Sequence, residues 1–306
     1  MINTLLNEIS AHDHRGAIVP ISCIDDLKQD MEDIKNGDLH TVAIGWMIGS
    51  IDKFVPAELD IIPRSIISVV VPCPQISLEF IYRGKSIDCL LPPTYTEMCS
   101  KEAEILQYIN AFLKPYNFKA VPADYLPHKM LAVHCGLGRY GRNNICYNEE
   151  FGSFIRLQSY ISDIPCGETD WFPLRRMDTC KKCHICVDAC PTNAIDLNRT
   201  IINADVCLTF MNEDANPFPD WLDGSAHHCL IGCMRCQNCC PHNIRNRNNV
   251  DKGISFTAEE TAELLEHKDD KSCTDTLAAK IKAAGISTYT NVLPRNLAAL
   301  LNNLSV

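Results

Sequence analysis

Residues 180–191 read CKKCHICVDACP, and their four cysteines, Cys180, Cys183, Cys186 and Cys190, follow the spacing C-x2-C-x2-C-x3-C before a proline. This spacing is typical of chains that bind two [4Fe–4S] clusters: three close thiolates surround one cluster, and the fourth binds the other. Zinc is the alternative metal, but zinc sites usually take one or two C-x2-C pairs and have no use for a third turn that ends in Cys-Pro. The run therefore predicts iron–sulfur chemistry.

A second run, CMRCQNCCP at residues 233–241, repeats the ending Cys-x3-Cys-Pro. Aligning the two endings shifts the second run by 50 residues, so that Leu230 takes the place of Cys180. Leucine cannot bind iron, and one ligand is then missing. The candidates for this ligand are Cys207, Cys229 and Cys239.

We favour Cys207 because it is isolated in the sequence and otherwise unexplained. Cys239 is the rival, but it is adjacent to Cys240, and the two neighbours would have to serve different clusters. The predicted ligands are Cys180, Cys183, Cys186 and Cys240 for the first cluster and Cys190, Cys207, Cys233 and Cys236 for the second. The other cysteines are expected to be buried thiols, and His227 and His228 are expected to be loop residues rather than ligands.

Composition places these runs in a globular chain of 306 residues that is 46% apolar and 22% charged, enough for two domains. Ten of its 18 cysteines lie between residues 180 and 240. The longest apolar stretch, residues 66–71, is far too short to span a bilayer, and we see no signal peptide. We therefore expect a reducing cytoplasm and no membrane. The net charge of −10 argues against a nucleic-acid partner.

The rest of the sequence predicts an α/β sandwich, followed by a ferredoxin-like double-cluster domain and a short helical tail. The expected domains are residues 1–165, 166–250 and 251–306. In the first, short apolar runs predict strands over residues 17–22, 66–73 and 151–161. Helical spacing predicts helices over 96–113, with Thr96 as N-cap, and over 127–135, ended by Gly136. In the tail, Thr257 and Glu260 form a capping box, and Pro294 opens a last helix.

A glycine segment, Gly136-x-Gly138-x-x-Gly141, lies before the first cysteine run. It follows a predicted helix rather than a strand, which disfavours a dinucleotide fingerprint. Glycines allow the backbone to pass close to a flat or bulky cofactor, and a plain turn is the alternative.

The sequence as a whole resembles epoxyqueuosine reductase and, more distantly, the reductive dehalogenases. The resemblance covers about residues 60–245. It is carried by the cysteine runs and by the stretches PRSIISVV at 63–70, GLGRYGRN at 136–143, FGS at 151–153, RL at 156–157 and SD at 162–163.

This resemblance implies that the α/β part holds base-off cobalamin and that the clusters reduce its cobalt to the nucleophilic Co(I) state. It places a corrinoid along Gly136, Gly138, Gly141, Arg142 and Asn143. The family usually has lysine where Arg142 stands, so the positive charge is kept.

The family's proton-donating aspartate belongs to an Asp-x-x-Pro segment, which Asp124 and Pro127 match, although the stretch to Gly136 is about two residues short. Asp124 is the candidate acid, with Tyr125 and His128 as substitutes. The alternative is that Asp124 caps the helix near Pro127.

Together these features predict an oxygen-sensitive reductase with two [4Fe–4S] clusters and cobalamin. We expect a ferredoxin or flavodoxin as electron donor, a small organic molecule as substrate and no tRNA. One rival is an electron-transfer protein that reduces a partner's corrinoid and has no substrate of its own. The other is a protein that holds clusters beside an empty, degenerate pocket.

Overall fold

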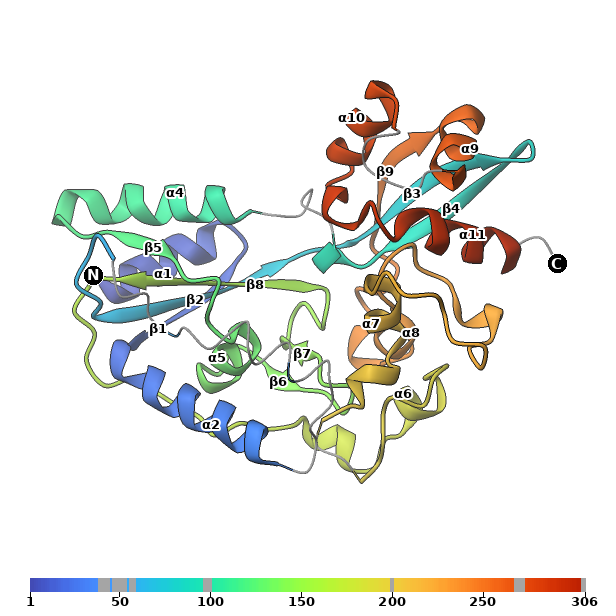
Figure 1. Ribbon diagram of the computed structural model, residues 1–306. Coiled ribbons are helices and arrows are strands. Elements are labelled where there is room, and N and C mark those ends of the chain that lie inside the picture. The colour runs from blue at the N-terminus through green and yellow to red at the C-terminus, as the bar shows by residue number, and fades with distance from the viewer. Residues whose placement is uncertain are drawn as a thin grey trace. The chain divides into compact units, whose positions relative to one another are not determined.

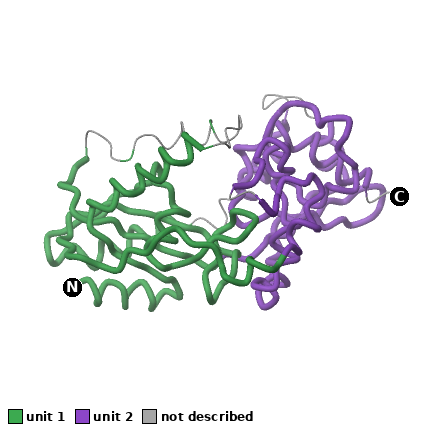
Figure 2. Tube along the Cα trace, turned by 90° about the horizontal axis from the view of Figure 1, so that it is seen from below, with its two compact units in different colours: residues 1–72, 101–183 green, residues 73–100, 184–306 purple. Residues whose placement is uncertain are grey.

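A computed structural model of the chain describes residues 1–37, 45, 54, 59–95, 101–198, 201–266 and 273–303. Within these, the chain forms two compact units, shown in Figures 1 and 2. Unit 1 contains residues 1–72 and 101–183, and unit 2 contains residues 73–100 and 184–306. The chain therefore enters unit 2, returns to unit 1 and enters unit 2 again, whereas the predicted division was into three consecutive segments.

The described residues of unit 1 form one main sheet, a short hairpin and several helices. The helices are α1 (Ile2–Ala11), α2 (Ile24–Asn36), α4 (Glu102–Leu113) and α5 (His128–His134). The strands are β1 (Arg15–Pro20), β2 (Ser65–Pro72), β5 (Ala120–Pro122), β6 (Arg139–Tyr140), β7 (Cys146–Tyr147) and β8 (Ile155–Ser162). The predicted helix over 96–113 corresponds to α4; its proposed cap, Thr96, lies outside the described residues.

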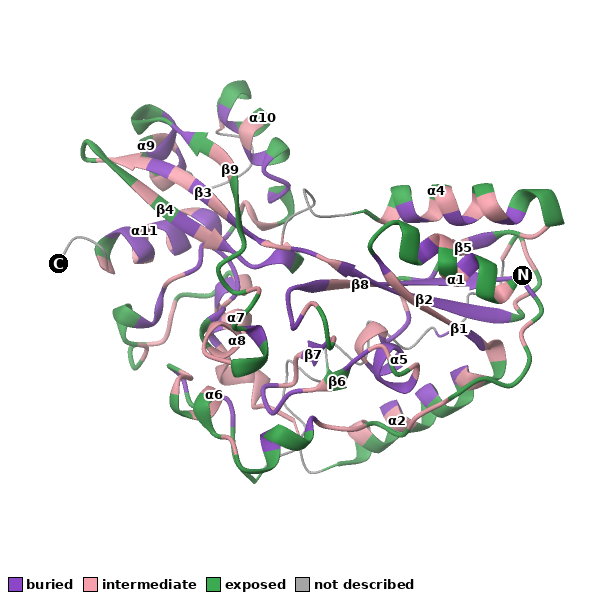
Figure 3. Cartoon of the chain, turned by 180° about the vertical axis from the view of Figure 1, so that it is seen from behind, coloured by how far each residue is buried: buried purple, intermediate pink, exposed green. Residues whose placement is uncertain are grey.

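The main sheet has the order β1-β2-β8-β5, and each neighbouring pair is antiparallel. One face packs on α1 and α4, where Ile67 and Tyr160 join the apolar core. The other face packs on α5, where Val70 meets Ala132 and Val133. Because both faces are covered, the apolar run of β2 is buried along its length, as Figure 3 shows. The predicted α/β sandwich is confirmed.

Unit 2 combines the cysteine-rich segment with a second sheet of order β4-β3-β9. Its strands are β3 (Gln75–Tyr82), β4 (Lys85–Leu91) and β9 (Val250–Phe256). Its helices are α6 (Ile185–Asp188), α7 (Leu208–Glu213), α8 (Arg235–Asn238), α9 (Ala258–Glu266), α10 (Asp275–Ala283) and α11 (Leu293–Asn303). A tight turn at Arg83 and Gly84, both with positive φ, joins β3 to β4. No helix in the described part of the chain is both long and apolar enough to cross a bilayer.

The C-terminal helices are part of the core of unit 2 rather than an appended tail. Leu297 and Leu301 of α11 share an apolar cluster with β3 and with Leu230 beside the second cysteine run. The Asn296 side chain of α11 donates hydrogen bonds to the carbonyls of Asn212 and Leu230, at 2.8 and 2.9 Å. The helix therefore supports the backbone of the cysteine-rich segment.

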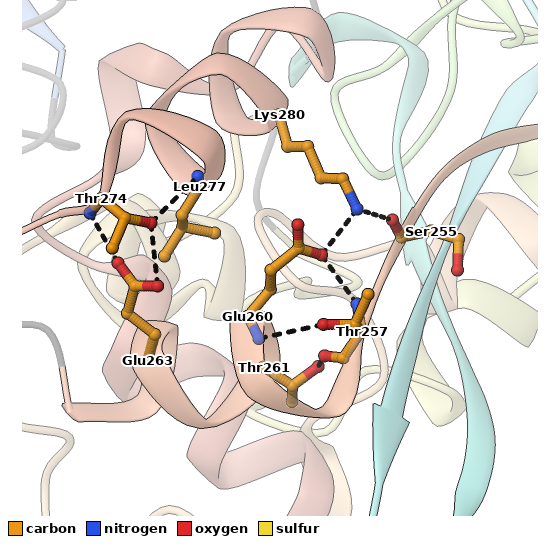
Figure 4. A network of polar contacts seen from close by, with 8 residues as sticks. All are labelled: Ser255, Thr257, Glu260, Thr261, Glu263, Thr274, Leu277 and Lys280. Atoms are coloured by element: carbon orange, nitrogen blue, oxygen red, sulfur yellow. Dashed lines mark hydrogen bonds and ion pairs between the residues drawn. The ribbon is translucent and has the colours of Figure 1, made fainter.

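The predicted capping box at the start of α9 is confirmed (Figure 4). The Thr257 N–H donates to Glu260 Oε2 at 2.7 Å, and the Glu260 N–H donates to Thr257 Oγ1 at 3.3 Å. Lys280 of α10 donates to Glu260 Oε2 at 2.6 Å and to the carbonyl of Ser255 at 2.8 Å. One carboxylate thus joins α9, α10 and the end of β9.

We expect Glu260→Ala to lower the free energy of unfolding at neutral pH by about 1–3 kcal/mol, because the Thr257 N–H and Lys280 lose a charged acceptor. Burial opposes ionisation of Glu260, but bonds from Lys280 and Thr257 outweigh it and lower the pKa. A lowered folded pKa stabilises the fold above the unfolded value, and that stability is lost as the pH falls through the folded pKa. Urea unfolding of wild type and variant should therefore converge in acid, while the exposed Glu266→Ala stays near wild type. A pH-independent difference would contradict this.

Candidate metal centre and cofactor site

The two cysteine runs have the same backbone conformation, displaced by 50 residues. In the first, the N–H groups of Asp188 and Cys190 donate to the carbonyls of His184 and Val187. In the second, the groups 50 residues later, of Asn238 and Cys240, donate to Met234 and Gln237 in the same way. Each run is a single helical turn, α6 or α8, followed by a Cys-Pro. The backbone repeat follows the register predicted from the Cys-x3-Cys-Pro endings.

In this repeat Cys239 corresponds to Ala189, the C-cap of α6. The Cys239 Sγ donates to the carbonyls of Cys236 and Ile185. Leu230, which corresponds to Cys180, is fully buried in the apolar core, and its N–H donates to Leu90 of β4. The local structure at both positions agrees with the register that leaves one ligand to be found elsewhere.

Three cysteines of the predicted second cluster are neighbours in unit 2. Burial raises the pKa of Cys233, and the nearby Cys207 and Cys190 contribute to the shift. Cys190 accepts a hydrogen bond from the Ala194 N–H at 3.3 Å. Burial also raises the pKa of Cys207, although N–H donors at the start of α7 oppose the shift. N–H groups directed at sulfur suit thiolate ligands of an iron–sulfur cluster.

The other candidate ligands in this region have structural partners. His228 Nδ1 is 2.9 Å from the carbonyl of Ala226, and its Nε2 accepts from the Met234 N–H at 3.0 Å. Cys229 is buried beside β4, and burial raises its pKa to about 12. Across the described residues, no three His, Cys, Asp or Glu side chains already surround a common point.

The predicted helix 127–135 is α5, and Gly136 ends it as expected, with a φ of +75°. The next two glycines contact the chain's own atoms. A Cβ on Gly138 would lie 2.6 Å from Cys146 Sγ, and one on Gly141 would lie 2.6 Å from a ring carbon of Tyr147. The tight β6–β7 hairpin explains why glycine stands at both positions. The glycines by themselves are therefore no evidence for a bound corrinoid ring.

Arg142 and Asn143, predicted to contact a corrinoid, are buried in the same hairpin, 7% and 3% exposed. Arg142 donates from Nε to the carbonyl of Cys183 at 3.1 Å and from Nη2 to the carbonyl of Cys180. Asn143 donates to the hydroxyl of Tyr147 at 2.9 Å. The predicted corrinoid cradle is therefore engaged by protein groups, and it does not fit a ring in this form.

The three predicted catalytic residues lie in and just after the loop between β5 and α5. Asp124 is exposed, and the N-cap of α5 is Pro127, with no side-chain cap bond. His128 Nδ1 is 2.8 Å from Ser159 Oγ, and burial lowers the pKa of His128. The hydroxyl of Tyr125 is buried with no hydrogen-bond partner among the described residues. The structure therefore does not support the alternative role of Asp124 as a helix cap.

Glu102, at the start of α4, is a partner of Asp124 that the sequence alone did not reveal. Burial raises the pKa of Glu102, and so do the charge of Asp124 and a hydrogen bond between the two side chains. Arg156 of β8 opposes the shift. The position of Glu102 in the first turn of a predicted helix was the only available signal.

Buried hydroxyls with no hydrogen-bond partner among the described residues favour a polar ligand. Besides Tyr125, Ser68 of β2 has such a hydroxyl. Ser68 is paired in register with Ser159, the neighbour of His128. Leaving such groups unsatisfied costs about 1–3 kcal/mol each. The amide-rich periphery of a corrinoid could satisfy them, so this region fits the group better than the glycine hairpin does.

Comparison with known proteins agrees with this description. The family described as a 4Fe-4S double cluster binding domain matches residues 179–243. Epoxyqueuosine reductase of Staphylococcus aureus is 34% identical over 123 residues, which cover 40% of this chain and 31% of the relative. That of Cyclobacterium marinum is 37% identical over 113 residues, which cover 37% of this chain and 35% of the relative. The match thus spans about a third of the length of these curated relatives.

Two solved structures share the fold over nearly the whole chain. Epoxyqueuosine reductase from Bacillus subtilis has a TM-score of 0.67 at 18% identity, covering 98% of this chain and 81% of the other. An epoxyqueuosine reductase solved with a tRNA-Tyr epoxyqueuosine-modified stem loop has a TM-score of 0.66 at 19% identity, covering 99% and 82%.

These findings correct one sequence-based expectation. From the sequence we expected a small-molecule substrate and no tRNA partner. Both predictions are contradicted by the name of the relatives and by the tRNA stem loop in a structure of the same fold. The reasoning from net charge was wrong because a total of −10 does not describe any local surface.

The resemblance read from the sequence is confirmed: this chain carries a 4Fe-4S double cluster binding domain, and its sequence and fold are similar to those of epoxyqueuosine reductase.

Proposed function

We propose that the chain is an iron–sulfur reductase that passes single electrons through two [4Fe–4S] clusters to a nucleoside carried on a tRNA stem loop. The observation that carries the proposal is the repeated pair of cysteine runs within the double-cluster segment. We assign Cys180, Cys183, Cys186 and Cys240 to the first cluster. We assign Cys190, Cys207, Cys233 and Cys236 to the second.

Each cluster carries one electron at a time, so a reduction that needs two electrons requires two transfers or a further redox group. Cobalamin is that group in the proposal, on the strength of the resemblance. It would supply a cobalt centre able to deliver electrons in pairs. Tyr125 and Ser68, whose buried hydroxyls have no partner among the described residues, would hold its amide groups.

The proton for the reduced substrate comes from Asp124 in this proposal. The side chain is exposed, so it can reach a bound nucleoside, and it lies beside Glu102, whose pKa is raised by burial and by Asp124. His128 cannot serve equally well, because burial lowers its pKa and favours the neutral ring. Tyr125 is a poorer acid still, because burial and the charge of Asp124 raise its pKa to about 12.

A basic patch in unit 1 supports the choice of an RNA partner. We define it as Arg139, Arg175, Arg176, Lys181 and Lys182. The stretch RRMDTCKK at residues 175–182 supplies four of these cations. The Tyr140 N–H donates to the carbonyl of Arg175 at 3.0 Å, which brings β6 and this stretch together.

The surroundings of Asp178 support a positive charge on this patch. A hydrogen bond from Lys181 and its charge lower the pKa of Asp178, and Arg139 and Arg175 lower it further. Arg175 also stacks over the ring of Phe172, 4.3 Å from its centroid. Such a patch suits the phosphate backbone of a stem loop, even on a chain of net negative charge.

We expect the double variant Arg175→Glu/Lys182→Glu to weaken binding of a fluorescein-labelled tRNA-Tyr stem loop by about tenfold or more, because phosphate contacts are lost. The slope of log affinity against log salt should flatten by about one per lost contact. Fluorescence anisotropy at several salt concentrations measures both.

The matched control is Lys28→Glu/Lys282→Glu, which reverses two exposed charges outside the patch and should bind as wild type does. If both double variants bound the stem loop equally weakly, net charge alone would explain the loss of affinity. The patch would then have no part in the proposal. A wild-type protein that holds both clusters but does not bind the stem loop would favour the electron-transfer alternative.

A further inference from the structure

We propose that Arg142 is a positioning residue for the first cluster: its guanidinium holds the backbone of Cys180 and Cys183, and its charge tunes the cluster that they bind. This inference deepens the proposed function and rests on it, because it takes these two cysteines as iron ligands. All the contacts that support it lie within unit 1.

The guanidinium bridges two carbonyl groups of the ligand run. Nε donates to the carbonyl of Cys183 at 3.1 Å, and Nη2 donates to the carbonyl of Cys180. The side chain is only 7% exposed, so these bonds are shielded from water and from salt. A planar fork with fixed donor directions suits two acceptors at set positions, which the single ammonium of lysine does not match.

A rigid turn presents Arg142 to the run. The Gly141 N–H donates to the carbonyl of Ile145 at 2.8 Å, and the Asn144 N–H donates to Gly141 at 3.1 Å. Asn144 has a φ of +60°. The glycine at 141 is needed because Asn143 and Tyr147 approach it too closely for a Cβ. The glycine segment thus fixes the position of Arg142.

The cysteine run is attached to the same hairpin from the other side. Met177 donates its N–H to the carbonyl of Tyr140 at 2.9 Å, and the Cys180 N–H donates to the carbonyl of Met177 at 3.0 Å. Residues 175–177 therefore connect β6 to Cys180 by hydrogen bonds. Arg142, from the same hairpin, adds a second connection through its bonds to the carbonyls of Cys180 and Cys183. The result is a preformed scaffold for two of the four thiolates.

A buried cation at this place also has an electrostatic consequence. A [4Fe–4S] cluster with four thiolates is negatively charged, and reduction adds one more negative charge. A nearby positive charge in a region of low dielectric favours the reduced form. Arg142 should therefore raise the midpoint potential of the first cluster relative to the same cluster without it.

The test is an anaerobic redox titration followed by EPR, with iron release in air as a second readout. In Arg142→Met we expect one of the two midpoint potentials to shift to a more negative value while the other stays unchanged. In Arg142→Lys the potential should stay near wild type because the charge is kept, but iron should be released faster because the fork is lost. Arg64→Met, which removes an exposed arginine of the same unit, is the control and should match wild type.

The outcomes separate this inference from the function on which it rests. If wild-type protein binds no clusters, the proposed function fails. If wild type binds two clusters and Arg142→Met changes neither potential, or shifts both by the amount seen for Arg64→Met, the role of Arg142 is overturned. If Arg142→Met does not fold, Arg142→Lys decides, because wild-type iron release in that variant also overturns the role.

Discussion

Cys207→Ser should lose one of the two clusters, so that iron falls from about eight to about four per chain after anaerobic reconstitution. The reason is the register of the second cysteine run. Leu230 occupies the place of a ligand and is buried in the apolar core, so the missing thiolate has to come from elsewhere. Cys207 is the cysteine that is isolated in the sequence and lies near Cys233 and Cys190 in the structure. Iron and sulfide analysis, with EPR of the reduced protein, measures the loss.

Cys239→Ser is the matched control and should keep about eight iron. Its backbone place corresponds to Ala189, which cannot bind iron, and its Sγ is directed at two carbonyl oxygens. Cys229→Ser separates the remaining candidate. If Cys239→Ser or Cys229→Ser loses a cluster while Cys207→Ser keeps both, our ligand assignment is wrong.

Asp124→Asn should lower turnover by about 10²–10⁴, the usual contribution of a positioned acid, while iron content and stem-loop binding stay unchanged. Asparagine keeps the size of the side chain but has no acidic proton to give. Because the N-cap of α5 is Pro127 and lacks a side-chain cap bond, the substitution should not weaken the helix. The assay is single-turnover reduction of an epoxyqueuosine-modified stem loop, with dithionite as the reductant and cobalamin supplied.

Glu102→Gln tests whether the neighbouring Glu102 supports Asp124 as the acid. In wild type burial and Asp124 raise the pKa of Glu102, so Glu102 keeps its proton to a higher pH than an ordinary glutamate does. With glutamine at position 102 that titration is lost, and the fall in activity with rising pH should move to lower pH. An unchanged pH profile would leave Asp124 to act alone. Wild-type turnover in Asp124→Asn would move the role of acid to another group.

Local patterns in the sequence were enough for several features of the fold. The apolar run of β2 and the glycine after α5 have local causes, namely burial on both sheet faces and a positive φ. The capping box of Thr257 and Glu260 needs only four residues. The spacing of the cysteines also gave the register that the backbone repeat of α6 and α8 follows.

The candidate site was harder to predict because its contacts join distant parts of the chain. Arg142 meets Cys180 across 38 residues, and Glu102 meets Asp124 from a different element. A sequence shows that glycines permit close approach, but it does not show what approaches. Here the partners of Gly138 and Gly141 are protein atoms, where the sequence suggested a corrinoid ring.

The same limit explains the difference in domain boundaries. Strands β3 and β4 follow β2 directly in the sequence, and nothing in their residues shows that they belong to another sheet. Their assignment depends on β9, which pairs with β3 in parallel from Val250 onward. Parallel pairing needs a long connection, so the pattern of neighbouring residues cannot reveal it.

The chain passes from unit 1 to unit 2, back to unit 1 and again to unit 2. During synthesis on the ribosome this path determines which strands are available for pairing first. The strands of the sheet of unit 1 are complete once β8 has been made, whereas the hairpin of β3 and β4 must wait for β9. During that interval Leu78 and Phe80, fully buried in the finished protein, lack the partners that cover them. Such a nascent hairpin has an open edge and an apolar face, the features that chaperones bind and that aggregation exploits.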